Sequence, residues 1–239
     1  MDTGPYASLV ASVSRPGASR DPFAADIRDE LAAWASASRR FREFVEAHRD
    51  KIRKKLRGAT DAEALRDVRA ELRLAHLLLG DRRIELVYEP YGAGKAGPDF
   101  SITYRATRRL NAEVTRLRRT PDAAAIAGLL LAKLHQLPPS APNVLVVAID
   151  GPVAAEPVIE AVAWLRGRAD AKHEPFFVER GFAGSRGFYD RFLRLGAVVV
   201  WSEGSGADAR STTWVNRSAR IAVPERALRA IVSALAAGT

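Results

Sequence analysis

The feature that most constrains the fold is an almost unbroken apolar run near the middle of the chain. Residues Asn143–Ile149 spell Asn-Val-Leu-Val-Val-Ala-Ile, and a similar run covers Ala197–Trp201. A strand with one face in solvent alternates apolar and polar residues, whereas a strand covered on both faces is apolar throughout. Both runs are far shorter than the roughly 18 residues that a membrane span requires, so we expect no membrane segment. The runs instead predict strands at the centre of a sheet with helices on both faces.

Helical spacing of apolar residues and short strand-like runs predict the other elements. We expect helices over residues 22–56, 60–79, 121–136, 155–165 and 224–236, with a break in the first near 36–38. We expect strands over 84–88, 99–104 and 110–117, forming an antiparallel meander before the buried strands. Thr60 and Glu63 have the spacing of a capping box at the start of the second helix. The predicted fold class is α/β, with a mixed central sheet flanked by helices.

The 239 residues divide into three predicted parts. Residues 1–22 are rich in Gly, Pro, Ser and Ala without periodicity, which predicts a flexible N-terminal arm. Residues 23–58 are an N-terminal helical extension, which ends with the basic run Lys51–Lys55. Such cations complement the dipole of a solvated helix end, and they also suit a surface that contacts phosphates. Residues 59–239 make up the α/β domain.

The net charge of +9 and the isoelectric point near 10.3 favour an acidic partner. Only six of the 37 lysines and arginines are lysine. Because the planar guanidinium of arginine binds phosphate oxygens in pairs, this balance points toward nucleic acid. A genome rich in G and C would also produce a chain that is rich in alanine and poor in lysine, so charge alone leaves both explanations open.

Several other classes of protein find no support in the sequence. The absence of cysteine excludes disulfides, a thiolate zinc site and a cysteine nucleophile. Met1–Pro5 lacks the basic flank and apolar stretch of a signal peptide, so we expect a cytoplasmic protein. Gly92–Gly97 matches G-x-G-x-x-G but leads into Pro98 and a strand rather than a helix, which indicates a glycine loop and not a dinucleotide site. The four histidines show no metal-ligand spacing.

Three acidic residues fall where one helix and two strands are predicted to meet. Glu71 lies on the helix over 60–79, Asp99 begins one strand and Glu113 lies on the next. If the two strands pair across their short turn, the carboxylates of Asp99 and Glu113 converge. Mg²⁺ commonly takes one or two carboxylates and fills its other positions with water and phosphate. Such an ion stabilises the charge of a phosphodiester displacement and lowers the pKa of a bound water.

Pro98-Asp99, fourteen residues before Glu113-Val114-Thr115 and with Glu71 on the preceding helix, resembles the motif of the PD-(D/E)XK nuclease superfamily. The resemblance covers roughly residues 60–150, and the order of elements agrees with that restriction-endonuclease-like fold. It implies that Glu71, Asp99 and Glu113 are catalytic residues that bind Mg²⁺, or Mn²⁺ in its place. It also implies DNA as the partner, and because some members act as dimers a homodimer is a further expectation.

The motif lysine of that superfamily, which helps to position or activate the attacking water, falls at Thr115. Either another cation reaches the site, or the fold is kept and cleavage is lost. Lys133, on the helix that follows the motif strand, is our first candidate for a displaced catalytic lysine, and Lys95 in the glycine loop is the second. Arg116 is predicted to point to the opposite face from Thr115, and arginine is a poor base because it stays protonated.

Arginines crowd the sequence around the motif. The candidate nucleic-acid-binding residues are Arg105, Arg108, Arg109, Arg116 and Arg118. A cationic ridge beside two carboxylates would hold phosphates within reach of a metal ion, and a solvated hairpin is the alternative interpretation.

Three functions therefore remain open at the level of sequence. The first is a Mg²⁺-dependent nuclease acting on DNA, whose nicking of plasmid would disappear in Asp99→Ala. The second is an inactive protein of the same fold that binds nucleic acid or a protein partner, with salt-dependent DNA binding and no cleavage. The third is an interaction protein whose basic helices over 26–57 dock an acidic partner, with no binding of DNA at low salt.

Overall fold

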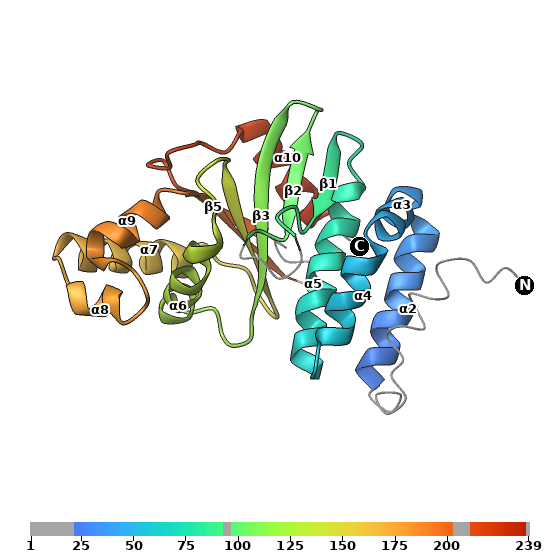
Figure 1. Ribbon diagram of the computed structural model, residues 1–239, viewed down its shortest axis with the longest axis horizontal. Helices are drawn as coiled ribbons and strands as arrows, with labels where there is room; N and C mark the ends of the chain where they lie inside the picture. The colour runs from blue at the N-terminus through green and yellow to red at the C-terminus, as the bar shows by residue number, and fades with distance from the viewer. Residues whose placement is uncertain (1–21, 93–96, 203–210, 238–239) are drawn as a thin grey trace, which may run out of the picture.

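The computed structural model describes residues 22–92, 97–202 and 211–237, and the side chains of the first range from Ile27 onward. Except for Pro22, the predicted N-terminal arm over 1–22 lies outside the described residues. Figure 1 shows a central sheet with a group of helices on each face. Among the described residues, no helix has both the length and the apolar character needed to cross a bilayer.

The described part of the chain forms one six-stranded sheet, in which the strands are ordered as they occur in the sequence. The strands are β1 (Ile84–Tyr88), β2 (Phe100–Tyr104), β3 (Arg108–Leu117), β4 (Asn143–Ile149), β5 (Leu195–Ser202) and β6 (Ser211–Val215). Strands β1, β2 and β3 are antiparallel, β3, β4 and β5 are parallel, and β6 is antiparallel to β5. The predicted meander and mixed sheet are confirmed. The pattern does not predict β6, because most of its residues are only half-buried and do not alternate.

The helices occupy both faces of the sheet. They are α2 (Pro22–Ala37), α3 (Arg39–Ala47), α4 (Arg49–Gly58), α5 (Ala62–Leu79), α6 (Ala123–Lys133), α7 (Glu156–Asp170), α8 (Glu174–Val178), α9 (Gly184–Phe192) and α10 (Glu225–Ala236), and the 3₁₀ turn η1 (Leu134–Gln136) extends α6. The short helices α8 and α9 are not predicted by the sequence. They are shorter than the window over which helical periodicity becomes distinct, although each buries a phenylalanine, Phe177 and Phe188.

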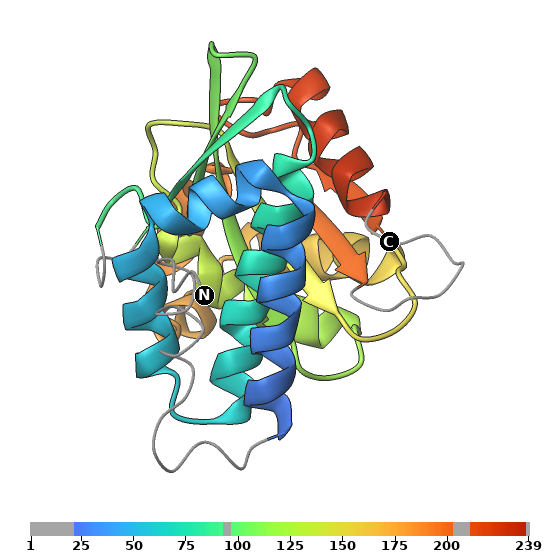
Figure 2. The same cartoon turned by 90° about the vertical axis from the view of Figure 1, so that its right-hand side faces the viewer.

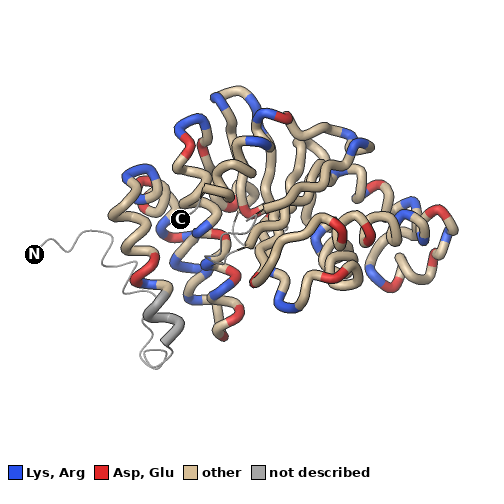
Figure 3. The backbone as a smooth tube through the Cα atoms, turned by 180° about the vertical axis from the view of Figure 1, so that it is seen from behind, with Lys and Arg blue, Asp and Glu red and all other residues tan. Residues whose placement is uncertain are grey.

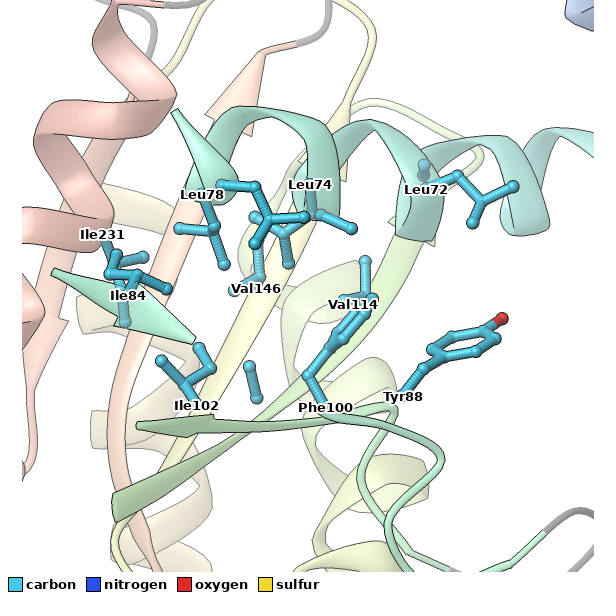
Figure 4. Packing of buried hydrophobic residues seen from close by; sticks show 14 of the residues in the cluster. Leu72, Leu74, Leu78, Ile84, Tyr88, Phe100, Ile102, Val114, Val146 and Ile231 are labelled. Carbon is cyan, nitrogen blue, oxygen red and sulfur yellow. The ribbon is translucent and has the colours of Figure 1, made fainter. Parts of the chain in front are cut away.

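Two apolar clusters cover the two faces of the sheet. In β4, the alternate residues from Val144 to Ala148 join the cluster beneath α2–α5 and α10, whereas those from Leu145 to Ile149 join the cluster beneath α6–α9. All seven residues of β4 are buried, as its unbroken apolar run predicts. Figure 4 shows part of the first cluster, with the hydroxyl of Tyr88 at its edge. That edge leads to the polar site described below.

The helices of the N-terminal extension share the first cluster with the sheet. Phe41 of α3 and Ile52 of α4 are fully buried in the same cluster as Phe100 of β2. The guanidinium of Arg40 donates to the main-chain oxygen of Asp81 at 2.7 Å, which ties α3 to the end of α5. Figure 2 shows α2, α3 and α4, in blue to cyan, packed beside α5. The extension is thus a layer of the folded domain, and α4 reaches the same edge of the core as Tyr88.

The helix predicted over 22–56 has a second break in addition to the expected one. The expected break falls at Ser38, whose side chain caps α3 by accepting from the amide of Phe41 at 3.2 Å. The second falls at His48, whose backbone leaves the helical region between α3 and α4. No proline or glycine marks this position, so local sequence gives no signal for it.

The start of α5 also differs from the prediction. Asp61, not Thr60, is the N-cap, and its carboxylate accepts from the amide of Ala64 at 2.8 Å. Glu63 does not complete a capping box, because its carboxylate pairs with Arg66 and Arg116. The helix therefore begins one residue later than a Thr60 cap would place it.

Candidate active site

A polar cavity opens where β2 and β3 separate. The described residues of these strands pair no further than Phe100 with Ala112, so the second half of β3 diverges from β2. The cavity between them measures about 350 Å³ and includes side chains from α4, α5, β3 and α6. Its charged and polar lining residues are Lys55, Asp67, Glu71, Glu89, Asp99, Glu113, Thr115, Lys133 and Gln136. The four predicted catalytic residues, Glu71, Asp99, Glu113 and Lys133, all line this one cavity.

Asp99 stands at the point of separation, immediately before β2. The main-chain amide of Val114 donates to Asp99 Oδ2 at 2.8 Å, and Lys55 Nζ donates to Asp99 Oδ1 at 3.1 Å. The amide of Val114 lies beyond the last pair of β2 and β3, so the carboxylate of Asp99 accepts from it in place of a strand carbonyl. The carboxylate of Asp99 is therefore fixed against β3 beside Glu113, as the predicted hairpin requires.

Glu113 is buried in the wall of the cavity, with only 3% of its surface exposed. Lys133 Nζ donates to Glu113 Oε1 at 2.6 Å and to Gln136 Oε1 at 3.2 Å. The other oxygen, Glu113 Oε2, is buried and has no hydrogen-bond partner among the described residues. Burial and the charge of Asp99 raise the pKa of Glu113 to about 7, against the opposing effect of Lys133. Glu113 is thus a buried carboxylate with one oxygen that accepts no hydrogen bond from the described residues.

Glu71 occupies the opposite wall and has more partners. Lys55 Nζ donates to its two oxygens at 2.8 and 2.7 Å, and the hydroxyl of Tyr88 donates to Glu71 Oε2 at 2.6 Å. Burial and the charge of Asp99 raise the pKa of Glu71 to about 8, although Lys55 and Tyr88 act in the other direction. Because both oxygens of Glu71 already accept hydrogen bonds, this residue is held as a partner of Lys55.

Lys55 and Glu89 belong to the site although the motif does not include them. Lys55 Nζ lies 3.7 Å from Glu89 Oε1, and Glu89 Oε2 is buried with no hydrogen-bond partner in the described part of the chain. Burial alone would lower the pKa of Lys55, but the carboxylates of Glu71 and Asp99 raise it above the usual value. Helical spacing provides a signal for Lys55, which follows the buried Ile52 by three residues and so lies on the inner face of α4.

The motif position Thr115 and the two candidates for a displaced lysine have different surroundings. Thr115 lines the cavity and carries no charge, so the motif position supplies no cation. Lys133 supplies an ammonium group to the cavity from α6, as expected of the first candidate for a displaced lysine. Lys95, the second candidate, lies outside the described residues.

The donor set fits a divalent cation held by two carboxylates. Among the described residues, no three His, Asp or Glu side chains are placed to share one metal ion, so Glu71, Asp99 and Glu113 do not form a three-carboxylate set. Mg²⁺ needs only one or two carboxylates when water and phosphate complete its shell. Asp99 and the unpartnered Oε2 of Glu113 provide such a pair. When ionised, the five carboxylates that line the cavity exceed the ammonium groups of Lys55 and Lys133 by three negative charges; they belong to Asp67, Glu71, Glu89, Asp99 and Glu113.

The candidate nucleic-acid-binding arginines fall into two groups. The first group is exposed at the turn between β2 and β3 and consists of Arg105, Arg108 and Arg109. Arg109 precedes Glu113 by four residues, or roughly 13 Å along a strand. The second group is paired with α5: Arg116 lies 3.2 Å from Glu63, and Arg118 lies 2.6 Å from Asp67. Figure 3 shows basic residues, in blue, at the turns on one end of the sheet.

Comparisons of the chain with protein-family models, with curated proteins and with solved structures find no match.

Proposed function

We propose that this chain is a divergent restriction-endonuclease-like protein that hydrolyses phosphodiester bonds in DNA with Mg²⁺ or Mn²⁺. The observation that carries the proposal is the meeting of Asp99, Glu113 and Lys133 at one cavity, with Lys133 Nζ 2.6 Å from Glu113 Oε1. The order of elements from α5 through the meander to β4 is the order in which the motif occurs in that fold. A cytoplasmic location is part of the proposal and agrees with a chain that has no cysteine.

The side chains around the cavity have distinct roles in this proposal. Glu113 would hold the cation through Oε2, because Lys133 engages its Oε1. Asp99 would hold it through Oδ1, in place of the 3.1 Å contact with Lys55, because the amide of Val114 engages its Oδ2. When bound, a divalent cation stabilises the charge of the phosphodiester displacement and lowers the pKa of a coordinated water. Lys133 counteracts the burial of Glu113 and so favours its ionised form. It also places a positive charge beside the motif strand, where Thr115 has none.

Nicking of supercoiled plasmid DNA in Mg²⁺ or Mn²⁺ tests the proposal. We expect nicking by the wild-type chain, loss of at least 100-fold in Asp99→Asn and Glu113→Gln, and a similar loss in Lys133→Met. Glu225→Gln is the matched control, because Glu225 lies in the first turn of α10 and is exposed. Nicking that persists in all three cavity variants would come from a contaminant and would contradict the proposal.

A second candidate function follows from the same contacts. Lys55 and Lys133 already pair with the carboxylates of the cavity, and a structural network of ion pairs would have this arrangement too. In that case the chain is an inactive member of the fold that binds nucleic acid or a protein. DNA binding that weakens steeply with salt, without nicking, would favour this alternative. No DNA binding at low salt would favour a protein partner.

A further inference from the structure

The ammonium group of Lys55 lies among three carboxylates of the cavity. Its distances are 2.7 Å to Glu71 Oε2, 3.1 Å to Asp99 Oδ1 and 3.7 Å to Glu89 Oε1. The side chain is only 26% exposed, so water screens these contacts less than it screens a surface pair. An ammonium group in this setting neutralises the same negative charge that would attract a divalent cation.

We propose that Lys55 is a tethered counter-ion that competes with the divalent cation for Asp99 and thereby sets how tightly the cavity binds that cation. The inference rests on the cation site of the proposed function but does not depend on DNA cleavage. It assigns a role in the site to α4, a helix of the N-terminal extension.

The orientation of the cation ligands does not depend on Lys55. Asp99 remains fixed through its other oxygen, which accepts from the amide of Val114 at 2.8 Å. Glu113 is fixed by Lys133, which lies on α6 and does not contact α4 in the described ion pairs. Loss of Lys55 should therefore leave both ligands in place while it removes one positive charge beside them.

Charge determines the direction of the effect. Lys55 and Lys133 are the two lysines that line the cavity in the described part of the chain, so a neutral residue in place of Lys55 removes one of its two ammonium charges. Like charges close together in a poorly solvated cavity repel strongly, so a divalent cation must approach against the charge of Lys55. Replacing Lys55 by a neutral side chain of similar length should therefore tighten binding of the cation.

Lys51 provides a matched control on the same helix. Lys51 Nζ donates to the main-chain oxygens of Tyr88 and Glu89 at 2.8 and 3.0 Å, one turn before Lys55. Its contacts in the structure are with neutral carbonyl groups and not with the carboxylates of the cavity. Lys51→Met thus removes an ammonium group from the same helix without removing a direct contact to Asp99.

Titration calorimetry with Mn²⁺ alone, at pH 7.5 and without DNA, tests the inference. We expect Lys55→Met to bind Mn²⁺ at least tenfold more tightly than the wild-type chain. Lys55→Arg, which keeps the charge, and Lys51→Met should both stay within about twofold of wild type. Thermal melting gives an independent readout: without metal Lys55→Met should melt below wild type, and Mn²⁺ should raise its melting temperature by more.

The outcomes separate this inference from the proposed function. Tighter binding in Lys55→Met supports the inference even if the wild-type chain nicks no DNA. The inference is overturned if Lys55→Met binds Mn²⁺ no more tightly than the wild-type chain. It is also overturned if Lys51→Met binds Mn²⁺ as tightly as Lys55→Met does. No Mn²⁺ binding by any of the variants overturns both the inference and the cation site. If Lys55→Met does not fold, Lys55→Gln keeps a hydrogen-bond donor for Glu71 and is judged by the same outcomes.

Discussion

Lys133 Nζ lies 2.6 Å from Glu113 Oε1, although the two residues are separated by 20 positions in the sequence. Glu113 lies within β3 and Lys133 is the last residue of α6. Lys133 thus brings an ammonium group from a helix to the cavity. Thr115, which lies two residues after Glu113 on β3, stands where the motif has lysine. The pair therefore supplies the positive charge that the proposed function requires beside Glu113.

Lys133→Met should destabilise the chain in a manner that depends on pH. At pH 8 an ionised and buried Glu113 would lose its partner, and breaking such a pair costs about 3 kcal/mol or more. At pH 5 Glu113 is protonated, because its pKa is raised to about 7, and the loss should be smaller. Urea unfolding at both pH values measures this, and Glu113→Gln in the same chain should restore most of the loss at pH 8. An equal loss at pH 5 and pH 8 would contradict the ion pair.

The free energy of unfolding without divalent cations should fall as the pH rises from 5 to 8. Burial and Asp99 raise the pKa of Glu113 to about 7 and of Glu71 to about 8, from the usual 4.5. In this range the folded chain retains protons that the unfolded chain has released, so raising the pH favours unfolding. Each group contributes up to about 1.4 kcal/mol per pH unit.

Glu113→Gln isolates one of these two groups. We expect the variant to have a smaller slope between pH 5 and pH 7, where both groups contribute, and to keep the share of Glu71, which extends to about pH 8. Glu225→Gln, far from the cavity on α10, should follow the wild-type profile. Urea unfolding in a chelator at four pH values gives the slopes, and an unchanged slope in Glu113→Gln would refute the assignment.

Tyr88→Phe should destabilise the chain through Glu71. The hydroxyl of Tyr88 donates to Glu71 Oε2 at 2.6 Å in a buried setting, and removing a donor from a buried charged acceptor costs about 1 to 3 kcal/mol. Tyr104→Phe is the matched control, because Tyr104 is also a buried tyrosine of the meander and contacts no carboxylate in the described ion pairs and hydrogen bonds. Guanidinium unfolding compares the two, and equal losses would show that the hydroxyl of Tyr88 contributes no specific interaction.

The exposed arginines of the β2–β3 turn should contribute more to DNA binding than the paired ones. Gln in place of Arg105, Arg108 and Arg109 should reduce the slope of log K against log salt by roughly two to three. Arg118→Gln should change the slope by less than one, because Arg118 is engaged with Asp67 at 2.6 Å. Fluorescence anisotropy at several salt concentrations measures both, and the opposite order would show that DNA binds along α5 instead.

The sequence predicts those strands of the sheet whose pattern of apolar residues fits only one kind of burial. The apolar run of β4 has to be covered on both faces, and its residues do join both clusters. Edge strand β6 could not be predicted, because Ser211–Val215 is half-buried and pairs with β5 on the basis of tertiary context. The break at His48 is likewise determined by packing and not by a local signal.

The sequence predicts those residues of the site that lie close to one another along the chain. Asp99 immediately precedes β2 and Glu113 lies on the neighbouring β3, so a hairpin alone brings them together. Lys133 follows on the next helix, and the missing charge at Thr115 directs attention to it. Lys55 is 44 residues from Asp99. Its helix ends in a basic run, whose charge alone predicts a solvated helix end. Its role depends on the packing of α4 against the sheet, which no motif records.

The central claim is that Asp99 and Glu113 together hold one divalent cation, and titration calorimetry of the wild-type chain with Mn²⁺ tests it most directly. We expect one bound ion per chain, with affinity reduced at least tenfold in Asp99→Asn and in Glu113→Gln and unchanged in Glu225→Gln. Absence of binding by the wild-type chain, or equal binding by all three variants, would contradict it.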